Sequence, residues 1–527
     1  MYSVACHATR IYKLGYNRIN TSPSYKKETV MNFRNIMNIG RKLLCDVRIH
    51  KVNQLTRHFS CNQIRLSSSK LHVCPRIGLS DQCLDIRADG LAAGQTVELR
   101  STVSTECGRY EFEAHAQYTA NEKGEISVND DPSEGGTFTG IEPMGLLSRV
   151  QSLPVHAAKY PRLYIFKPTN PLVYTISMYD TDSGKSNSIQ QEELDSVIVE
   201  RHFVAPYVEH SFVECGRAMG TLYLPKKANQ SSPVPLVIEM PGLGPTFARD
   251  RFPLLASHGF GVFEFDYFQS LKDDLQNHGN AYLNCRLLIV SSFIKTYQEN
   301  VIKALCFPRE HPDIDENRIG LNGTCYGGTL ALNAVSRIPD LPIQCLGVQR
   351  CIDFLATHVG LETIDGNIIE PAGPIGLYTR ITKRDGEEWF EFDFDHMVHH
   401  IDYRADFIPP VEDISIPTLL LVSGDDQQCA SEKCLARVAS RIHSAGNSNL
   451  LETHYFEGAG HLLDSPYFPL CRQSKVYMPN IDGAKLVNWG GDPALHARAL
   501  VKSWQKTISF YQRHLRPEED WRQDWHD

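Results

Sequence analysis

Residues 318–338 read RIGLNGTCYGGTLALNAVSRI, and this stretch decides the fold of the second half of the chain. Its first five residues have the composition of a buried strand, whereas residues 329–338 have the apolar spacing of a helix. Gly323 and Gly327 flank the turn between them, so the backbone can bend sharply and the helix can approach the strand. This strand–turn–helix order predicts a nucleophile elbow, with Cys325 as the nucleophile.

The position of Cys325 also predicts its reactivity. A thiol at the N-terminus of a helix lies at the positive end of the helix dipole, which lowers its pKa and favours the thiolate. The alternative interpretation is a buried structural thiol, because most free cysteines act as small apolar side chains. The strand before Cys325 and the helix after it favour the nucleophile.

Strand-like and helical stretches alternate on both sides of the elbow. This alternation predicts a mostly parallel sheet with helices on both faces, which together with the elbow indicates an α/β-hydrolase fold. The expected strands are residues 220–224, 235–240, 261–267, 318–322, 344–348, Thr418–Ser423 and 450–456.

An elbow nucleophile needs an acid and then a histidine further along the chain, each just past the end of a strand. The strand Thr418–Ser423 runs into Asp425 and Asp426, and the strand at 450–456 runs into a glycine-rich loop that ends in His461. We expect His461 to take the proton of Cys325 and one of the two aspartates to orient the imidazole ring. Spacing alone does not choose between the aspartates.

The elbow also predicts where the oxyanion of a tetrahedral intermediate is stabilised. One donor is the backbone N–H of Tyr326, which follows the nucleophile. The second is expected from the loop after the strand at 235–240, at Leu243. The alternative role for the glycines beside Leu243 is to form the turn alone.

The chain before residue 206 has a different character. Residues 70–205 contain short alternating segments separated by polar turns, which is typical of a small antiparallel β-sandwich. Residues 206–527 form the predicted α/β-hydrolase domain, in which the aromatic and acidic segment 352–412 interrupts the rhythm as a cap or as an irregular insertion. The expected strands of the sandwich are residues 84–87, 96–101, 109–118, 163–167 and 173–179.

Residues 1–69 have the composition of a mitochondrial transit peptide. The first 70 residues carry 13 Lys and Arg against two acids, although the whole chain has a net charge of −9. The sequence Arg57-His58-Phe59-Ser60 resembles a matrix-processing site. The expectation is import into the mitochondrial matrix. The alternatives to a transit peptide are a disordered basic tail and an extension ahead of a start at Met31. The alternative locations are the cytosol and the peroxisome.

Composition excludes several other classes of protein. No uncharged apolar run reaches about 18 residues, so no membrane span is expected. The 15 cysteines follow no disulfide framework and no zinc-ligand spacing, which indicates reduced thiols and no metal site. Neither a nucleic-acid partner nor a cofactor is expected, and the sequence does not predict an oligomeric state.

Two further motifs resemble a known family. Residues 135–147, GGTFTGIEPMGLL, are similar to a distinctive stretch in the N-terminal domain of the acyl-CoA thioesterase and bile acid-CoA:amino acid N-acyltransferase family. The segment after His461 resembles the family's segment after its catalytic histidine. It contains SPYFPLC at 465–471 and Trp489-Gly-Gly followed by His496. The resemblance covers nearly everything after about residue 72.

The resemblance implies a catalytic triad of Cys325, Asp426 and His461, with the second aspartate of the pair as the acid. It implies that the substrate is the CoA thioester of a long or branched acid. A cysteine nucleophile is similar to that of the N-acyltransferase, whereas the double glycine after Tyr326 is similar to that of the thioesterases. Hydrolysis is therefore the first expectation, and transfer to glycine or taurine is the alternative.

Two rival interpretations remain open. A dienelactone-hydrolase-like enzyme also has a Gly-x-Cys-x-Gly-Gly elbow, but the N-terminal sandwich and the segment after His461 argue against it. The other is a non-catalytic acyl-binding protein with a relic triad, against which the intact order of Cys325, Asp426 and His461 argues.

Overall fold

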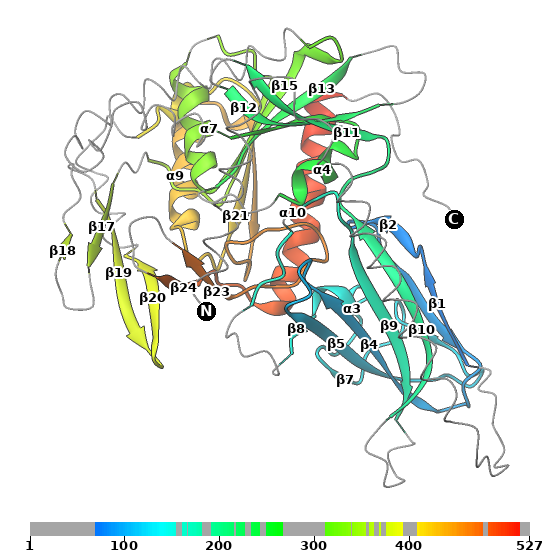
Figure 1. Cartoon of the computed structure of the whole chain (residues 1–527). Helices are drawn as coiled ribbons and strands as arrows, with labels where there is room; N and C mark the ends of the chain where they lie inside the picture. The colour runs from blue at the N-terminus through cyan, green and yellow to red at the C-terminus, as the bar shows by residue number, and fades with distance from the viewer. Residues whose placement is uncertain are drawn as a thin grey trace, which may run out of the picture. The chain divides into compact units, whose positions relative to one another are not determined.

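The computed structural model describes most of the chain after residue 68. The ranges are 69–153, 161–165, 167–181, 191–215, 218–226, 233–242, 249–266, 311–338, 340–354, 358–362, 368–369, 376–393, 408–477 and 483–516. Residues 1–68, which include most of the expected transit segment, lie outside them. Figure 1 shows the described part as a set of sheets with helices packed against the largest of them.

The N-terminal region forms two sheets that share one core, as the alternating pattern predicts. The smaller sheet has the order β1-β3-β6, and the larger has the order β2-β10-β9-β4-β5-β7 with β8 beside β5. Pairing is antiparallel except between β10 and β2, which is parallel. The elements are β1 (Lys70–Cys74), β2 (Ile77–Leu79), β3 (Asp85–Asp89), β4 (Thr96–Ser104), β5 (Glu111–Thr119), β6 (Ile126–Ser127), β7 (Gly135–Gly136), α3 (Gly145–Ser148), β8 (Gln151–Ser152), β9 (Leu172–Asp180) and β10 (Glu192–His202).

One strand expected in this region is absent. Residues 163–165 belong to no strand, although Leu163 and Ile165 are buried. The neighbouring Arg162 instead forms a buried ion pair with Asp464 at 3.1 Å, in the segment that follows His461. The apolar side chains of Leu163 and Ile165 are therefore buried without belonging to a sheet.

The largest sheet has eight strands in the order β11-β12-β14-β13-β15-β16-β21-β22. The first three strands pair antiparallel, and the pairs from β14 to β22 are all parallel. This mostly parallel sheet with helices against it confirms the predicted α/β-hydrolase fold. The strands are β11 (Val208–Cys215), β12 (Ala218–Pro225), β13 (Val234–Met240), β14 (Gly261–Phe265), β15 (Ile314–Thr324), β16 (Cys345–Gln349), β21 (Thr418–Ser423) and β22 (Leu451–Phe456).

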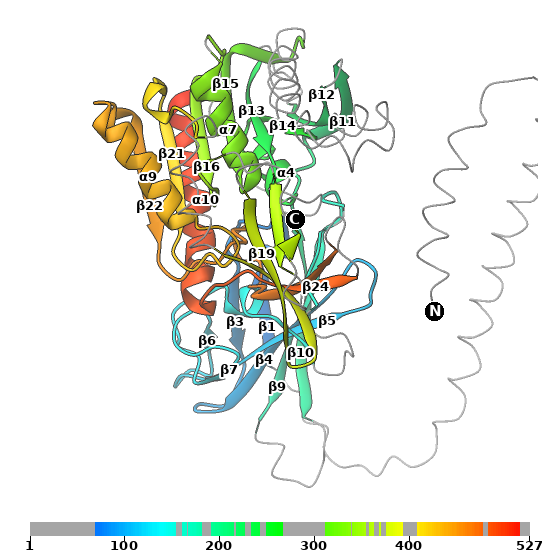
Figure 2. The ribbon, with the colours of Figure 1, turned by 90° about the vertical axis from the view of Figure 1, so that its left-hand side faces the viewer.

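Helices cover both faces of this sheet. On β21, Leu419 and Leu421 belong to the core that contains α4 and α10, whereas Leu420 and Val422 belong to the core that contains α7 and α9. Successive residues of a strand point to opposite faces, so the two pairs of helices lie on opposite sides (Figure 2). The helices are α4 (Arg251–Ala256), α7 (Tyr326–Arg337), α9 (Ser431–Ser444) and α10 (Pro493–Leu515), with short 3-10 helices η6 (Val411–Asp413) and η7 (Ser448–Leu450).

The segment 352–412, predicted as a cap or an irregular insertion, contributes strands to a further sheet in its described part. That sheet has the order β18-β17-β19-β20-β24-β23, so it joins the segment to two strands that follow His461 in the chain. The role of a cap stays a prediction. The strands are β17 (His358–Glu362), β18 (Ile368–Ile369), β19 (Gly376–Arg384), β20 (Glu387–Phe392), β23 (Gln473–Tyr477) and β24 (Ala484–Asn488).

Buried polar contacts join the N-terminal sheets to the hydrolase part. The carboxylate of Asp81 accepts a hydrogen bond from the Trp504 indole at 2.9 Å and lies 2.6 Å from the His258 ring. The ion pair of Arg162 with Asp464 is also almost fully buried. No helix among the described residues is long and apolar enough to span a membrane.

Candidate active site

The predicted elbow has the backbone geometry that such a turn requires. Cys325 lies between the end of β15 and the start of α7, with φ of 55° and ψ of −126°. A residue with a Cβ adopts such a positive φ only at an energetic cost, which the surrounding structure must offset. A side chain on Gly323 would meet Gly328 Cα at 2.6 Å, and one on Gly327 would meet Met240 O at 2.0 Å. These glycines are therefore required by close packing around the turn.

The structure brings Cys325, Asp426 and His461 together, although they lie on three separate loops. Each loop follows a parallel strand, namely β15, β21 or β22, and the carboxyl ends of these strands face the same edge of the sheet. The imidazole Nδ1 of His461 lies 2.9 Å and 3.0 Å from the two carboxylate oxygens of Asp426. A ring nitrogen of the same imidazole lies within 4.8 Å of the Sγ atom of Cys325.

The structure distinguishes the two aspartates that spacing left open. Asp425 accepts a hydrogen bond from the backbone N–H of Gly491 at 2.8 Å and from the side chain of Gln427 at 2.8 Å. It therefore supports the loop that contains Gly491 and makes no hydrogen bond to His461 within the described residues. Asp426 alone of the two bonds to the imidazole, as the family resemblance implies.

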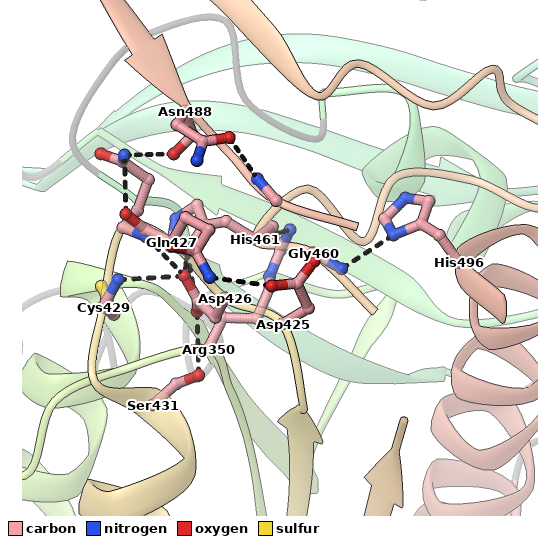
Figure 3. A network of polar contacts seen from close by, with 12 residues as sticks. Arg350, Asp425, Asp426, Gln427, Cys429, Ser431, Gly460, His461, Asn488 and His496 are labelled. Atoms are coloured by element: carbon pink, nitrogen blue, oxygen red, sulfur yellow. Dashed lines mark hydrogen bonds and ion pairs between the residues drawn. The ribbon is translucent and has the colours of Figure 1, made fainter. Parts of the chain in front are cut away.

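Asp426 is held by further donors (Figure 3). The backbone N–H groups of Gln428 and Cys429 donate to one carboxylate oxygen at 2.9 Å and 3.0 Å, and the Ser431 hydroxyl donates to the other at 2.9 Å. Burial opposes ionisation of Asp426, but His461 and these donors outweigh it and lower its pKa. The carboxylate therefore stays charged, and it fixes the orientation of the ring.

The ring of His461 is fixed on its other sides as well. It stacks on the indole of Trp489 with centroids 5.9 Å apart, and its backbone N–H donates to Trp489 O at 2.7 Å. The guanidinium of Arg350, which follows β16 with a φ of 54°, donates to the carbonyl of His461. The preceding Gly460 donates its N–H to Nδ1 of His496 at 3.0 Å. Burial lowers the pKa of His496 to about 4, so that ring is neutral and can accept.

The electrostatics of the site favour a thiolate–imidazolium pair. A hydrogen bond from the thiol of Cys429 is the largest influence on Cys325, and together with His461 it lowers the pKa of Cys325 well below its ordinary value, against the effect of burial. Burial opposes protonation of His461, but the charges of Asp426 and Cys325 outweigh it and raise its pKa to about 9. Both shifts favour the thiolate of Cys325, and the thiolate is the form of cysteine that can act as a nucleophile.

Sequence reasoning missed Cys429. Its Sγ, the Sγ of Cys325 and a ring nitrogen of His461 lie within 4.8 Å of one another. Cys429 lies three residues after Asp426, in the loop between β21 and α9. This short separation along the sequence from the expected acid was the one signal that could have distinguished Cys429 from the other cysteines.

The predicted oxyanion hole is described in part. The N–H of Tyr326 is the first of helix α7, so it has no acceptor within the helix and is available to a ligand. Leu243 lies outside the described residues. Its neighbour Gly242 lies directly against the nucleophile, because a Cβ there would come 2.9 Å from Cys325 Cβ. The loop after β13 therefore reaches Cys325, and the donor role of Leu243 stays a prediction.

A strained elbow at the end of a parallel strand, with a histidine and a carboxylate on the loops that follow later strands, defines an α/β hydrolase. Sequence comparison gives the family. Residues 81–214 match the acyl-CoA thioester hydrolase/BAAT N-terminal region, and residues 298–517 match the BAAT/acyl-CoA thioester hydrolase C-terminal domain. The chain belongs to this family, as the resemblance predicted.

Curated relatives are similar over most of their length. Acyl-coenzyme A thioesterase 1 of Mus musculus is 30% identical over 435 residues, which cover 82% of this chain and 94% of the relative. Acyl-coenzyme A thioesterase 2, mitochondrial, of Homo sapiens is 29% identical over 82% of each chain. The peroxisomal succinyl-coenzyme A thioesterase of Mus musculus is 27% identical over 82% of this chain and 94% of the relative.

Solved structures are similar at a lower level. A dienelactone hydrolase-like promiscuous phosphotriesterase, P91, from metagenomic libraries has 14% identity and a TM-score of 0.32, covering 58% of this chain and 99% of that chain. Prolyl oligopeptidase B from Galerina marginata has 12% identity and a TM-score of 0.38, covering 86% of this chain and 58% of that chain.

Proposed function

We propose that the protein is an acyl-CoA thioesterase that works through a covalent acyl-enzyme on Cys325. The observation that carries this proposal is that His461 bonds to Asp426 and lies within 4.8 Å of the Cys325 sulfur, at the elbow of a chain from the acyl-CoA thioester hydrolase family. The thiolate of Cys325 attacks the carbonyl carbon of the thioester. The tetrahedral intermediate then expels CoA as its thiolate, which takes a proton from His461.

In the second half of the reaction, His461 is neutral and accepts a proton from water as the water attacks the acyl-enzyme. Collapse of this second intermediate releases the free acid and restores the thiolate of Cys325. In both intermediates the N–H of Tyr326 donates to the oxyanion, and the N–H of Leu243 is the proposed second donor. The reaction needs no metal and no redox cofactor.

The proposed substrates are CoA thioesters of fatty acids, long or branched, because the family resemblance implies this class. The names of the relatives support a CoA thioester as the substrate, since they describe acyl-coenzyme A thioesterases. One relative is named for the short succinyl-CoA, so chain length is the variable to test. A panel of acyl-CoA thioesters that differ in length and branching would rank the substrates by kcat/KM.

A second candidate function is transfer of the acyl group to an amino acid. It is favoured by the nucleophile, because Cys325 forms a thioester, which is more reactive toward amines than an oxygen ester. Transfer also needs a pocket that orients glycine or taurine against the far more abundant water, and orientation of this kind can supply several kcal/mol, up to roughly 7–11 kcal/mol, of a barrier. Hydrolysis is therefore the first proposal and conjugation the second.

Product analysis separates these functions. The wild type is incubated with acyl-CoA and an excess of glycine or taurine, and the amide and the free acid are quantified. Free acid alone would exclude transfer to these two acceptors. If the thioester intermediate directs the acyl group to amines, Cys325→Ser lowers the ratio of amide to acid. An unchanged ratio would show that an acceptor site decides the outcome.

The nucleophile itself is tested by Cys325→Ala. Loss of a triad nucleophile costs on the order of 10⁴–10⁶ in rate, so release of CoA should be nearly abolished. Cys471→Ala is the matched control, because Cys471 is also a half-buried thiol but lies outside the site. Wild-type turnover in the Cys325 variant would refute the mechanism. A wild type that binds acyl-CoA without releasing CoA would identify a non-catalytic acyl-binding protein.

We also propose a location in the mitochondrial matrix, on the composition of the first 69 residues. The named relatives include mitochondrial and peroxisomal thioesterases, so a peroxisomal or cytosolic protein is the alternative. The proposal is tested by the mature N-terminus of the endogenous protein.

A further inference from the structure

The thiol of Cys429 has no step of its own in the proposed reaction, yet it lies beside both reacting side chains. The Sγ atoms of Cys325 and Cys429 and a ring nitrogen of His461 lie within 4.8 Å of one another. We propose that these three side chains form a site for a thiophilic divalent cation, Zn²⁺ first, and that the bound ion inhibits the enzyme. Metal binding stands independently of the proposed function, whereas inhibition rests on it.

The three donor atoms suit zinc in type and in spacing. Zinc prefers thiolate sulfur and imidazole nitrogen in a tetrahedral arrangement, with bonds of about 2.3 Å to sulfur and about 2.0–2.1 Å to nitrogen. In that geometry two sulfurs lie roughly 3.8 Å apart, and a sulfur and a nitrogen lie roughly 3.6 Å apart. The observed limit of 4.8 Å leaves the side chains little distance to move.

The surrounding hydrogen bonds already hold two of the three ligands in place. Asp426 bonds to Nδ1 of His461 at 2.9 Å, which leaves Nε2 as the nitrogen that can bind a metal. The same carboxylate accepts the backbone N–H of Cys429 at 3.0 Å. A carboxylate that orients a metal-binding histidine is the usual outer shell of a zinc site, and its loss typically weakens binding about 10- to 100-fold.

The two cysteine residues of the cluster are partly exposed. Cys325 and Cys429 are half-buried, whereas Cys345, Cys351 and Cys434 are fully buried. Binding displaces the proton of the Cys429 thiol and any proton on Nε2 of His461, and the electron pair of the Cys325 thiolate becomes a metal bond. Three protein ligands leave the fourth tetrahedral position open. The nucleophile and the general base are then both engaged, which is why the ion inhibits.

Cobalt(II) and zinc titrations of the intact protein, reduced and freed of metal beforehand, test the proposal. Cobalt should give the visible bands of a tetrahedral site and a sulfur-to-metal charge-transfer band. The charge-transfer band should fall to about half in Cys429→Ser, which keeps the size and the backbone N–H of the residue but supplies a poor ligand. Zinc inhibition, measured against each variant's own metal-free turnover, should weaken by at least about 100-fold in that variant, because a direct ligand counts for more than an outer-shell one.

Cys471→Ser is the matched control, since it removes a half-buried thiol outside the cluster and should bind cobalt and zinc as the wild type does. The proposal would be overturned by equal zinc inhibition of the wild type and Cys429→Ser. It would also be overturned if Cys429→Ser kept the full charge-transfer band, as Cys471→Ser should. Unfolding midpoints of the variants exclude misfolding as the cause. A protein that binds cobalt through both sulfurs but never releases CoA would refute the proposed function alone, whereas turnover without metal binding would refute this site alone.

Discussion

Replacing Asp426 by Asn exchanges one carboxylate oxygen for an NH₂ group, and this changes the hydrogen bonding of the side chain with His461. In the structure every partner of Asp426 donates: the imidazole Nδ1, the N–H groups of Gln428 and Cys429, and the Ser431 hydroxyl. The two backbone N–H groups donate to one oxygen and cannot accept, so the oxygen of an asparagine must face them. Its NH₂ group then takes the place of the oxygen that accepts from Ser431 and lies 3.0 Å from Nδ1 of His461, whereas its oxygen keeps the position 2.9 Å from Nδ1.

This exchange has two consequences for His461. The hydroxyl of Ser431 can rotate and accept, but Nδ1 of the imidazole now lies between an oxygen and an NH₂ donor, so the tautomer with its proton on Nδ1 is no longer fixed. A ring that instead holds its proton on Nε2 cannot take a proton from Cys325 or from water, and the negative charge that stabilises the imidazolium is lost. The same exchange in a Ser-His-Asp triad costs about 10⁴ in kcat. Because Cys429 as well as His461 lowers the pKa of Cys325, we expect a loss on the order of 10²–10⁴ in kcat/KM, or about 3–5 kcal/mol.

Asp425→Asn is the matched control. An asparagine there can keep its oxygen toward the N–H of Gly491 and lose only the bond from Gln427, which is exposed. A single hydrogen bond of this kind contributes about 1 kcal/mol, so we expect a change of less than about tenfold. The assay is chromatographic measurement of CoA release for both variants and the wild type, with thermal unfolding to show that each is folded. A larger loss in Asp425→Asn than in Asp426→Asn would refute the assignment of the acid.

The remaining predictions concern pH, stability and processing. The pKa of Cys325 is lowered and that of His461 is raised to about 9, so the thiolate–imidazolium pair is populated between the two values. Because an ordinary thiol has a pKa of about 8.5, kcat/KM should rise well below pH 8.5 and fall through about pH 9. A profile that first rises near pH 8.5 would contradict this charge state. Arg162→Met leaves the buried carboxylate of Asp464 without its partner and should lower the free energy of unfolding by about 3–5 kcal/mol in denaturant titrations, and a change below about 1 kcal/mol would show that the ion pair does not stabilise the fold. Mass spectrometry of the endogenous protein should find a mature N-terminus near residue 60, and an intact N-terminus at Met1 in a cytosolic protein would exclude import.

The fold and the elbow were predictable because they are written in contiguous residues. Burial on both faces makes the middle of a strand such as Thr418–Ser423 a continuous apolar run, and the structure places β21 at those bounds. The elbow needs small residues at fixed offsets from Cys325, and these offsets are visible in the sequence. A local pattern of this kind also misleads, since Leu163 and Ile165 are buried next to the ion pair of Arg162 but belong to no strand.

Contacts between loops that lie far apart in the chain became visible only in the folded protein. The class of fold, the elbow, and the order of nucleophile, acid and histidine could be predicted from the sequence. It did not place Cys429 beside Cys325, because the approach of two loops depends on how β15 and β21 are ordered in the sheet and on where each loop turns. Spacing left Asp425 and Asp426 equivalent, and only the family resemblance favoured Asp426. Adjacent residues point in different directions, and the folded loop directs one carboxylate to His461 and the other to Gly491.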